Sequence, residues 1–143
     1  MLKGLHPLLG AELLHVLAAM GHGDELALVD RNFPAVSRAT RTVPLLGADM
    51  AQASEAVLSV FPLDTFVTEP VLRMEVVGEP DAVPPVQQEF LDRCQRAEGR
   101  ELQMGVLPRE AFYRRAEAAF AVVSTSEARP YGCFVLVKGV VHE

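Results

Sequence analysis

The sequence predicts an α/β fold in which helices cover both faces of a mostly parallel sheet. Three observations support this prediction. Segments with helical periodicity alternate with short apolar runs of strand length, prolines and glycines separate them, and the chain has 143 residues. A chain of this length fits one domain with a core of its own, over residues 1–143. We find no internal repeat, low-complexity tract or linker.

In the first half of the chain, individual residues mark where elements begin and end. Pro7 suits the first turn of a helix, whose apolar residues recur at three- and four-residue spacing until Gly21. A short apolar run that ends in Asp30 predicts a buried strand, and Asp49 can cap a helix that stops before Pro62. The expected elements are a helix over 7–20, a strand over 25–29, a short strand near 39–43 within a loose segment over 31–47, and a helix over 50–60.

The second half continues the alternation of strands and helices. Pro70 and Gly78 bound a loosely alternating run, Pro85 opens a helix that Gly99 breaks, and Pro108 begins another helix. The expected elements are strands over 71–77 and 102–106, helices over 84–97 and 108–119, and strands over 120–125 and 134–141.

Charge and hydropathy limit the kinds of partner. Nineteen acidic residues outnumber thirteen Lys and Arg, which argues against nucleic acid because phosphate binding needs a basic face. The expected ligand is therefore neutral or cationic. Half of the residues are hydrophobic, a high share for a small acidic domain, and we expect subunit interfaces to cover the excess.

The cysteines and the N-terminal segment bear on the compartment. Cys94 and Cys133 are too few for a disulfide framework, and no Cys/His cluster suggests zinc, so a reducing cytoplasm fits best. Polar residues such as His6 and Glu12 interrupt the apolar character of residues 1–20. We therefore expect a soluble protein without a signal peptide or a membrane span.

The most informative pattern for chemistry is the segment MGHGDELALVDRNFP, which starts at Met20. His22 lies between two glycines just beyond a predicted helix end, where the helix dipole favours a protonated imidazole. It could transfer protons near neutral pH, or it could be a surface histidine in a glycine-rich cap. Asp30 could orient a hydroxyl or accept its proton, or it could form a turn with its own backbone.

Further candidates lie in the last third of the chain. Arg109, in the first turn of its helix, could reach a ligand, and Tyr113 would share its face at the i+4 position. Tyr131, Gly132 and Cys133 precede the last strand and could present an aromatic ring at the mouth of a site. The alternatives are an exposed arginine and a tyrosine that packs half-buried.

Several common site motifs are missing from the sequence. It contains no glycine-rich phosphate loop, no GxSxG nucleophile elbow and no metal-ligand spacing among its His and Cys residues. Nucleotide-dependent chemistry and serine hydrolysis are therefore poor explanations of its function.

Three segments of the chain resemble the fucose mutarotase and ribose pyranase family. They are the opening MLKGLHPLLGAELLHVLAAMGHGDELALVDRNFP, the segment REAFYRRAEAAFAVV and the late YGCFVLVKG, so the resemblance runs nearly end to end. The family implies an α/β subunit in a ring-shaped oligomer, commonly a decamer, with sites between neighbouring subunits. It implies no cofactor and a small neutral monosaccharide as the ligand.

The resemblance also implies roles for single residues. His22 matches the family's catalytic histidine. The positions that match its sugar-binding residues and late motif are Asp30, Arg109, Tyr131, Gly132 and Cys133. Cys133 departs from the family pattern, Tyr-Gly-Asn or Tyr-Ala-Asn, because a thiol is a weaker hydrogen-bonding group than an amide. Gly132 and the FYRRA context favour the fucose branch.

The implied activity interconverts the α and β anomers of a reducing sugar, with L-fucose first, by acid/base ring opening and closure. His22 would handle one proton, and the protein would be an isomerase. Three alternatives remain: a pyranase that acts on D-ribose, a noncatalytic sugar-binding subunit, and an oligomeric scaffold that binds no sugar. Neither nucleic acid nor a membrane is an expected partner.

Overall fold

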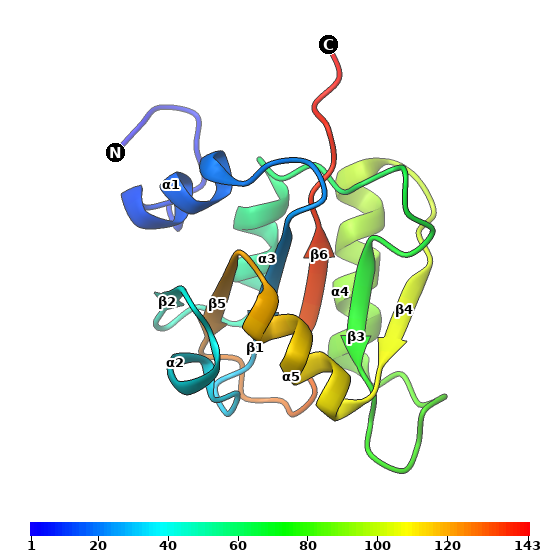
Figure 1. The fold of residues 1–143 in the computed structure, drawn as a ribbon. Helices are drawn as coiled ribbons and strands as arrows, with labels where there is room; N and C mark the ends of the chain where they lie inside the picture. The colour runs from blue at the N-terminus through cyan, green and yellow to red at the C-terminus, as the bar shows by residue number, and fades with distance from the viewer.

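A six-stranded sheet forms the centre of the computed structural model, which describes residues 1–143 (Figure 1). The strands are β1 (Glu25–Val29), β2 (Thr42–Leu45), β3 (Val71–Met74), β4 (Met104–Leu107), β5 (Ala121–Thr125) and β6 (Phe134–Val137). The helices are α1 (Ala11–Ala19), α2 (Ala35–Arg38), α3 (Met50–Leu58), α4 (Pro85–Glu98) and α5 (Arg109–Ala118). None of these helices has the length and apolar character that crossing a membrane requires.

The sheet has the order β2-β5-β1-β6-β3-β4. The pairs β2–β5, β5–β1 and β3–β4 are parallel, whereas β6 is antiparallel to both of its neighbours, β1 and β3. The predicted mostly parallel sheet is thus confirmed, with one reversed strand in the middle. No helix separates β5 from β6, and a parallel connection would need such a crossover.

The side chains of the strands alternate between two hydrophobic clusters, one on each face of the sheet. Leu26 and Leu28 belong to the cluster that includes α1, α3 and α4, whereas Ala27 and Val29 belong to the cluster beneath α2 and α5. Helices therefore cover both faces, as the sequence predicts, and Figure 1 shows α5 in front of the sheet with α3 and α4 behind it.

Several helix ends follow the predicted local signals. Asp49 forms a capping box with Gln52 at the start of α3, since each side chain accepts a hydrogen bond from the other residue's backbone N–H. Gly99 ends α4 in the left-handed conformation, with a φ of 67°, which glycine adopts without a steric penalty.

Other boundaries differ from the prediction. α1 begins at Ala11 rather than Pro7, because the backbone at Gly10 is extended. The loose segment after Asp30 contains the unpredicted helix α2, which displaces the expected strand to β2 at Thr42–Leu45. β3 and β6 are shorter than predicted. The ladder of β6 ends where Val137 pairs with Glu25, the first residue of β1.

The connection between β5 and β6 is held by the buried carboxylate of Glu127. Its oxygens accept hydrogen bonds from the Met50 N–H at the start of α3 (3.1 Å) and from the backbone and side chain of Arg129 (both 3.0 Å). Burial alone would raise the pKa of Glu127, but these hydrogen bonds and the Arg129 charge lower it to about 2. The connection is therefore anchored by an ionised side chain.

This anchor predicts how stability depends on pH. Because the folded pKa of Glu127 lies below its ordinary value of 4.5, its contribution is complete above about 4.5 and is lost as the pH falls toward about 2. We expect Glu127→Gln to lower the urea midpoint at pH 7 and to flatten its decline between these pH values. Glu101→Gln, at an exposed position, serves as the control. A native slope retained by Glu127→Gln would contradict the prediction.

Candidate functional site

The loop that carries His22 is held by the end of β6. The ammonium group of Lys138 donates hydrogen bonds to the carbonyls of Leu17 and Met20, both at 2.6 Å. The Lys138 carbonyl accepts a hydrogen bond from the N–H of Gly23 (2.8 Å). A cation is favourable at the carboxyl end of α1, where carbonyls lack partners within the helix. The loop therefore has a defined position beside β6.

The imidazole of His22 is hydrogen-bonded to a buried carboxylate, Asp64. The distance from Nε2 to Oδ1 is 2.9 Å, and the Asp64 side chain is 2% exposed against 46% for His22. Burial would raise the pKa of Asp64, but hydrogen bonds from His22 and from the N–H groups of Val67 and Phe66 outweigh it and lower the pKa. The carboxylate stays ionised and accepts a hydrogen bond from the Nε2–H group, which leaves Nδ1 without a partner in the chain.

His22 faces an open cavity of about 570 Å³ at the edge of the sheet where β1 begins. The ring of Phe66, which is 75% exposed, lies 5.0 Å from the imidazole between ring centroids. Glu25 and Arg115 also line this cavity and form a two-point ion pair, at 2.8 and 3.0 Å. A small polar ligand would find an imidazole, an aromatic ring and charged hydrogen-bonding groups here.

Asp30 lies at the opposite end of β1. Its Oδ1 accepts hydrogen bonds from the N–H groups of Asn32 (3.0 Å) and Phe33 (3.2 Å), so the turn with its own backbone is present. The thiol of Cys133 donates to Oδ2 at 3.5 Å. Burial and the nearby Asp30 raise the pKa of Cys133 well above its ordinary value, so the thiol keeps its proton. Asp30 and Cys133 are therefore one hydrogen-bonded unit.

Most of the residues predicted to bind a sugar surround this unit. Asp30, Arg109, Tyr131 and Cys133 line a cavity of about 270 Å³, together with Tyr113 and Met74. Arg109 donates through Nε and Nη2 to the Tyr113 hydroxyl, at 3.3 and 3.2 Å, which confirms the shared helix face.

Gly132 belongs to the same segment but does not line the cavity. A Cβ atom at this position would lie 3.1 Å from Glu127 and 3.4 Å from Val86, so the close packing of the chain favours glycine. The preceding residue, Tyr131, has a φ of 63° and is the only residue other than glycine with a positive φ. The backbone is therefore constrained at both residues, by the positive φ of Tyr131 and by the close packing around Gly132.

His22 and Asp30 do not meet within one chain. They lie beyond opposite ends of β1, whose five residues span about 17 Å, and their two cavities share no lining residue. In Figure 1 the loop before β1 is at the upper edge of the sheet, whereas the loops after β1 and β3 are at its lower edge. A single chain therefore presents two separate groups of predicted site residues, the half-sites at His22 and at Asp30.

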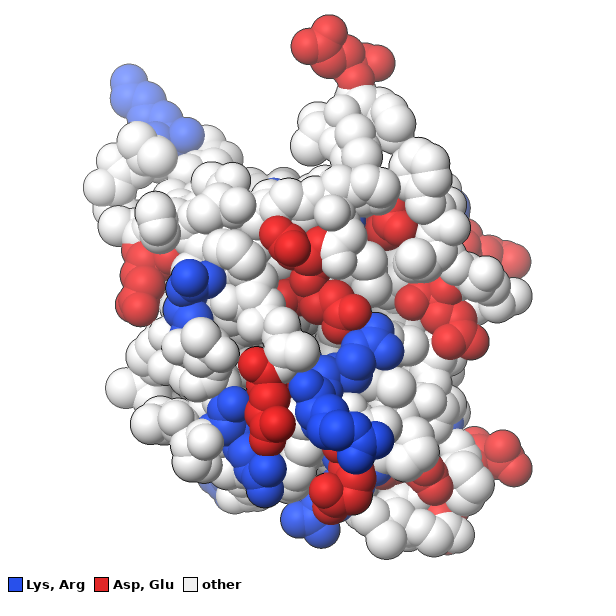
Figure 2. Space-filling model, viewed as in Figure 1, with Lys and Arg blue, Asp and Glu red and all other residues white.

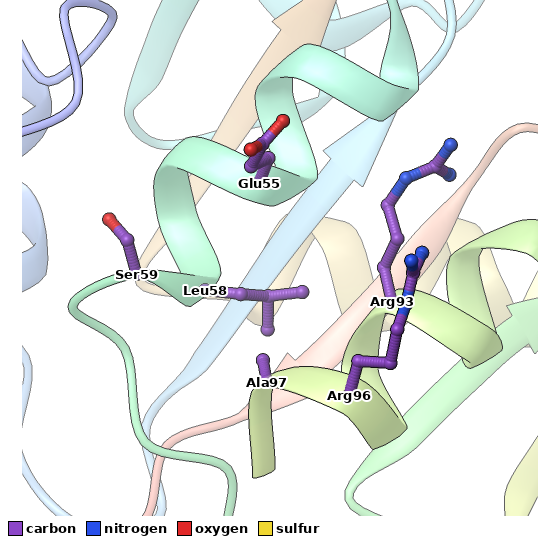
Figure 3. Close-up of a pocket in the computed structure, with 6 residues that line it drawn as sticks. All are labelled: Glu55, Leu58, Ser59, Arg93, Arg96 and Ala97. Atoms are coloured by element: carbon purple, nitrogen blue, oxygen red, sulfur yellow. The ribbon is translucent and has the colours of Figure 1, made fainter. Parts of the chain in front are cut away.

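A third cavity, of about 540 Å³, lies between α3 and α4, away from both half-sites (Figure 3). It is lined by Glu55, Leu58, Ser59, Arg93, Arg96 and Ala97. Figure 3 shows Arg93 and Arg96 extending from α4 beside α3. None of the predicted site residues lies in this groove.

Charges on the face covered by α5 are mixed in sign (Figure 2). Arg38 pairs with Glu117 and Arg115 pairs with Glu25, each at 2.8 Å. This face therefore lacks the continuous basic patch that a phosphate backbone needs. No group of three or more His, Cys, Asp or Glu side chains is placed to hold a metal ion. The half-sites offer proton transfer at His22 and hydrogen bonding around Asp30.

Sequence reasoning missed Asp64 and Phe66. They lie in the loop before β3, 42 residues or more from His22 in sequence, and belong to no recognisable motif. The one local signal is weak: the buried residues Phe61 and Leu63 precede Asp64, so the chain enters the interior there. The end of β6 holds both segments: Val137 accepts a hydrogen bond from the N–H of Asp64, and Lys138 accepts one from the N–H of Gly23.

Comparison with known proteins relates this chain to a known family. Residues 3–141 match the model of the RbsD / FucU transport protein family. An L-fucose mutarotase of Actinobacillus pleuropneumoniae is 39% identical over 140 residues, which cover 98% of this chain and 97% of that protein.

Solved structures agree with the family match. The fucose mutarotase of Streptococcus pneumoniae, solved in complex with L-fucose, superposes with a TM-score of 0.90 at 33% identity and covers 99% of this chain and 100% of that one. RbsD of Bacillus subtilis, solved with D-ribose, has a TM-score of 0.73 at 21% identity, covering 99% and 100% of the two chains, and shares the fold. The match over nearly its whole length shows that the chain belongs to the RbsD / FucU family, as its sequence motifs predicted.

Proposed function

We propose that the protein is a sugar mutarotase, an isomerase of the racemase/epimerase type, that interconverts the α and β anomers of L-fucose. The observation that carries this proposal is the imidazole of His22, which lines a cavity and has Nε2 held by ionised Asp64, so that Nδ1 has no partner within the chain. Relatives named L-fucose mutarotase, one of them solved with L-fucose, support the choice of sugar. The reaction needs only proton transfers, so we propose no cofactor.

The chemistry consists of two balanced proton transfers. Ring opening removes the proton of the anomeric hydroxyl, forms the C1=O1 bond and breaks the bond from C1 to the ring oxygen, which takes up a proton. Rotation about C1–C2 and closure on the other carbonyl face reverse these steps. His22 Nδ1 handles one of the two protons, and the Asp64 carboxylate stabilises the imidazolium that forms.

The second half-site positions the sugar. The side chains of Asp30, Arg109 and Tyr131 bind its hydroxyls and ring. Cys133 lines the cavity beside Asp30, and Gly132 allows the chain to pack closely against Glu127 behind it. Asp30 has a fixed orientation because its oxygens already accept hydrogen bonds from the backbone and from Cys133. In this role it orients the sugar and does not transfer the proton itself.

The two half-sites act together across the boundary between neighbouring subunits of a ring-shaped oligomer, which we propose is a decamer. Exposed apolar side chains beside both cavities support such a contact: Phe66 (75% exposed) and Val67 (43%) near His22, and Val77 (62%) near Tyr131. In a cyclic assembly the contact is head-to-tail, so the His22 end of one subunit can meet the Asp30 end of the next. Two buried free thiols are consistent with a cytoplasmic location.

His22 provides the first test. We expect His22→Ala to reduce the protein-dependent exchange between the anomeric protons of L-fucose by about 10²–10⁴-fold, the usual contribution of a positioned acid or base. NMR exchange spectroscopy measures this rate directly, with D-ribose as the second sugar. His15→Ala, at an exposed histidine of α1, should exchange the anomers at the native rate.

The outcome separates the alternatives. Native-rate exchange by His22→Ala would overturn the assigned role of the imidazole. Saturable L-fucose binding without faster exchange in the native protein would instead support a noncatalytic sugar-binding subunit, and acceleration with D-ribose alone would indicate a pyranase.

The shared site predicts complementation between two inactive variants. His22→Ala and Arg109→Ala damage different half-sites, so neither homo-oligomer should accelerate exchange. In a one-to-one mixed assembly, about one quarter of the sites would draw both intact halves from neighbouring subunits. We expect co-expressed, differently tagged subunits to recover a corresponding share of the native rate. No recovery in verified mixed oligomers would contradict a site shared between neighbouring subunits.

Cys133 predicts a difference in sugar affinity. An amide at this position could donate to Asp30 and still offer a second N–H and a carbonyl to the sugar, whereas the thiol has one weak donor. We expect Cys133→Asn to lower the KM for L-fucose by about two- to ten-fold, the value of one net hydrogen bond, with kcat nearly unchanged. Cys133→Ser, which keeps a single donor, is the matched control. An unchanged KM in Cys133→Asn would show that this side chain makes no contribution.

A further inference from the structure

Arg73 occupies a position in β3 where the alternation of side chains would place an apolar residue. Its neighbour at i−2, Val71, belongs to the hydrophobic cluster that includes α4, and Arg73 is only 3% exposed. The guanidinium forms no ion pair. It donates instead to the side-chain oxygen of Gln87 (3.1 Å) and to the carbonyl of Pro80 (2.8 Å). Burying a cation whose hydrogen-bond partners are neutral costs free energy of desolvation, so the position of Arg73 in β3 needs an explanation.

Gln87, the partner of Arg73 on α4, is completely buried and uses its whole amide group. Its Oε1 accepts the hydrogen bond from Arg73, and its Nε2 donates to the carbonyls of Met74 (2.8 Å) and Tyr131 (3.1 Å). Every buried polar side-chain atom in the chain likewise has a partner. The pair therefore joins β3 and α4 to the backbone of Tyr131.

Tyr131 needs such support. Its φ of 63° is unfavourable for a residue with a Cβ atom, and such conformations persist only where the surroundings determine them. Its hydroxyl accepts a hydrogen bond from the N–H of Val77 (3.3 Å), in the loop whose Pro80 carbonyl is bound by Arg73. Both Tyr131 and Val77 line the cavity at Asp30.

We infer that Arg73 and Gln87 are positioning residues for the sugar-binding half-site. Gln87 holds the Tyr131 backbone in its left-handed conformation, and Arg73 holds the loop that carries Val77. Two walls of one cavity thus depend on a single buried guanidinium–amide pair that does not itself line the cavity. The role in sugar binding rests on the proposed function, whereas the tethering of the two loops does not.

The substitution Gln87→Glu separates the acceptor role of the amide oxygen from the donor role of the amide nitrogen. A carboxylate keeps the acceptor for Arg73 but has no N–H to donate to the carbonyls of Met74 and Tyr131. We expect hydrogen–deuterium exchange, followed by mass spectrometry, to accelerate in peptides covering 75–82 and 129–133 and to stay native in α1 and α3. We also expect the KM for L-fucose to rise about two- to ten-fold, as for the loss of one net hydrogen bond, with kcat and its pH profile unchanged. Gln88→Glu, at the adjacent exposed position, is the matched control.

A second variant guards against misfolding caused by the new charge. The double substitution Arg73→Met with Gln87→Met replaces the buried polar pair by apolar side chains, which often preserves stability. We expect it to keep the native far-ultraviolet circular dichroism and to show the same two fast-exchanging segments and the same rise in KM.

The outcomes distinguish this inference from the proposed function. Native exchange in residues 75–82 and 129–133 of both variants, or faster exchange throughout the chain, would overturn the tether. Fast exchange confined to those segments supports the tether even if the native protein proves inactive on L-fucose. Localised exchange with an unchanged KM in an active enzyme would overturn the role in sugar binding.

Discussion

The antiparallel strand β6 is the element on which both half-sites depend. It lies between β1 and β3 and joins the two parallel parts of the sheet. Just before it, Tyr131 and Cys133 enter the cavity at Asp30, and at its other end Lys138 holds the loop of His22. Val137 also accepts a hydrogen bond from the N–H of Asp64. Because one strand carries groups at both ends, its register sets the geometry of both cavities.

The two half-sites have different physical designs. At His22, a buried carboxylate fixes one imidazole nitrogen while nearly half of the side chain stays exposed, which suits the proposed role in proton transfer. At Asp30, the backbone and a protonated thiol occupy the carboxyl oxygens, which suits a group that orients a ligand. The length of β1 keeps the two groups apart in one chain, and the proposed ring of subunits would bring them together.

Three buried polar residues support the loop that carries Tyr131. Arg73 and Gln87 occupy places where hydrophobic side chains would pack at lower cost, yet they lie behind the only left-handed residue other than glycine. Glu127 likewise anchors the connection that leads to Tyr131. Arg73, Gln87 and Glu127 thus all hold loops that shape the Asp30 cavity, and such departures from an apolar interior are common at functional sites.

The sequence by itself determined the α/β class, most elements, the capping box at Asp49 and the turn at Asp30, because these depend on neighbouring residues and short-range hydrogen bonds. Its motifs also indicated the family and the residues His22, Asp30, Arg109 and Tyr131. Only the tertiary structure decided that β6 is reversed, that Asp64 is the partner of His22, and that His22 and Asp30 are separated. The physical reason is that strand pairing and buried polar contacts join residues distant in the chain, and no local pattern encodes which of them will meet.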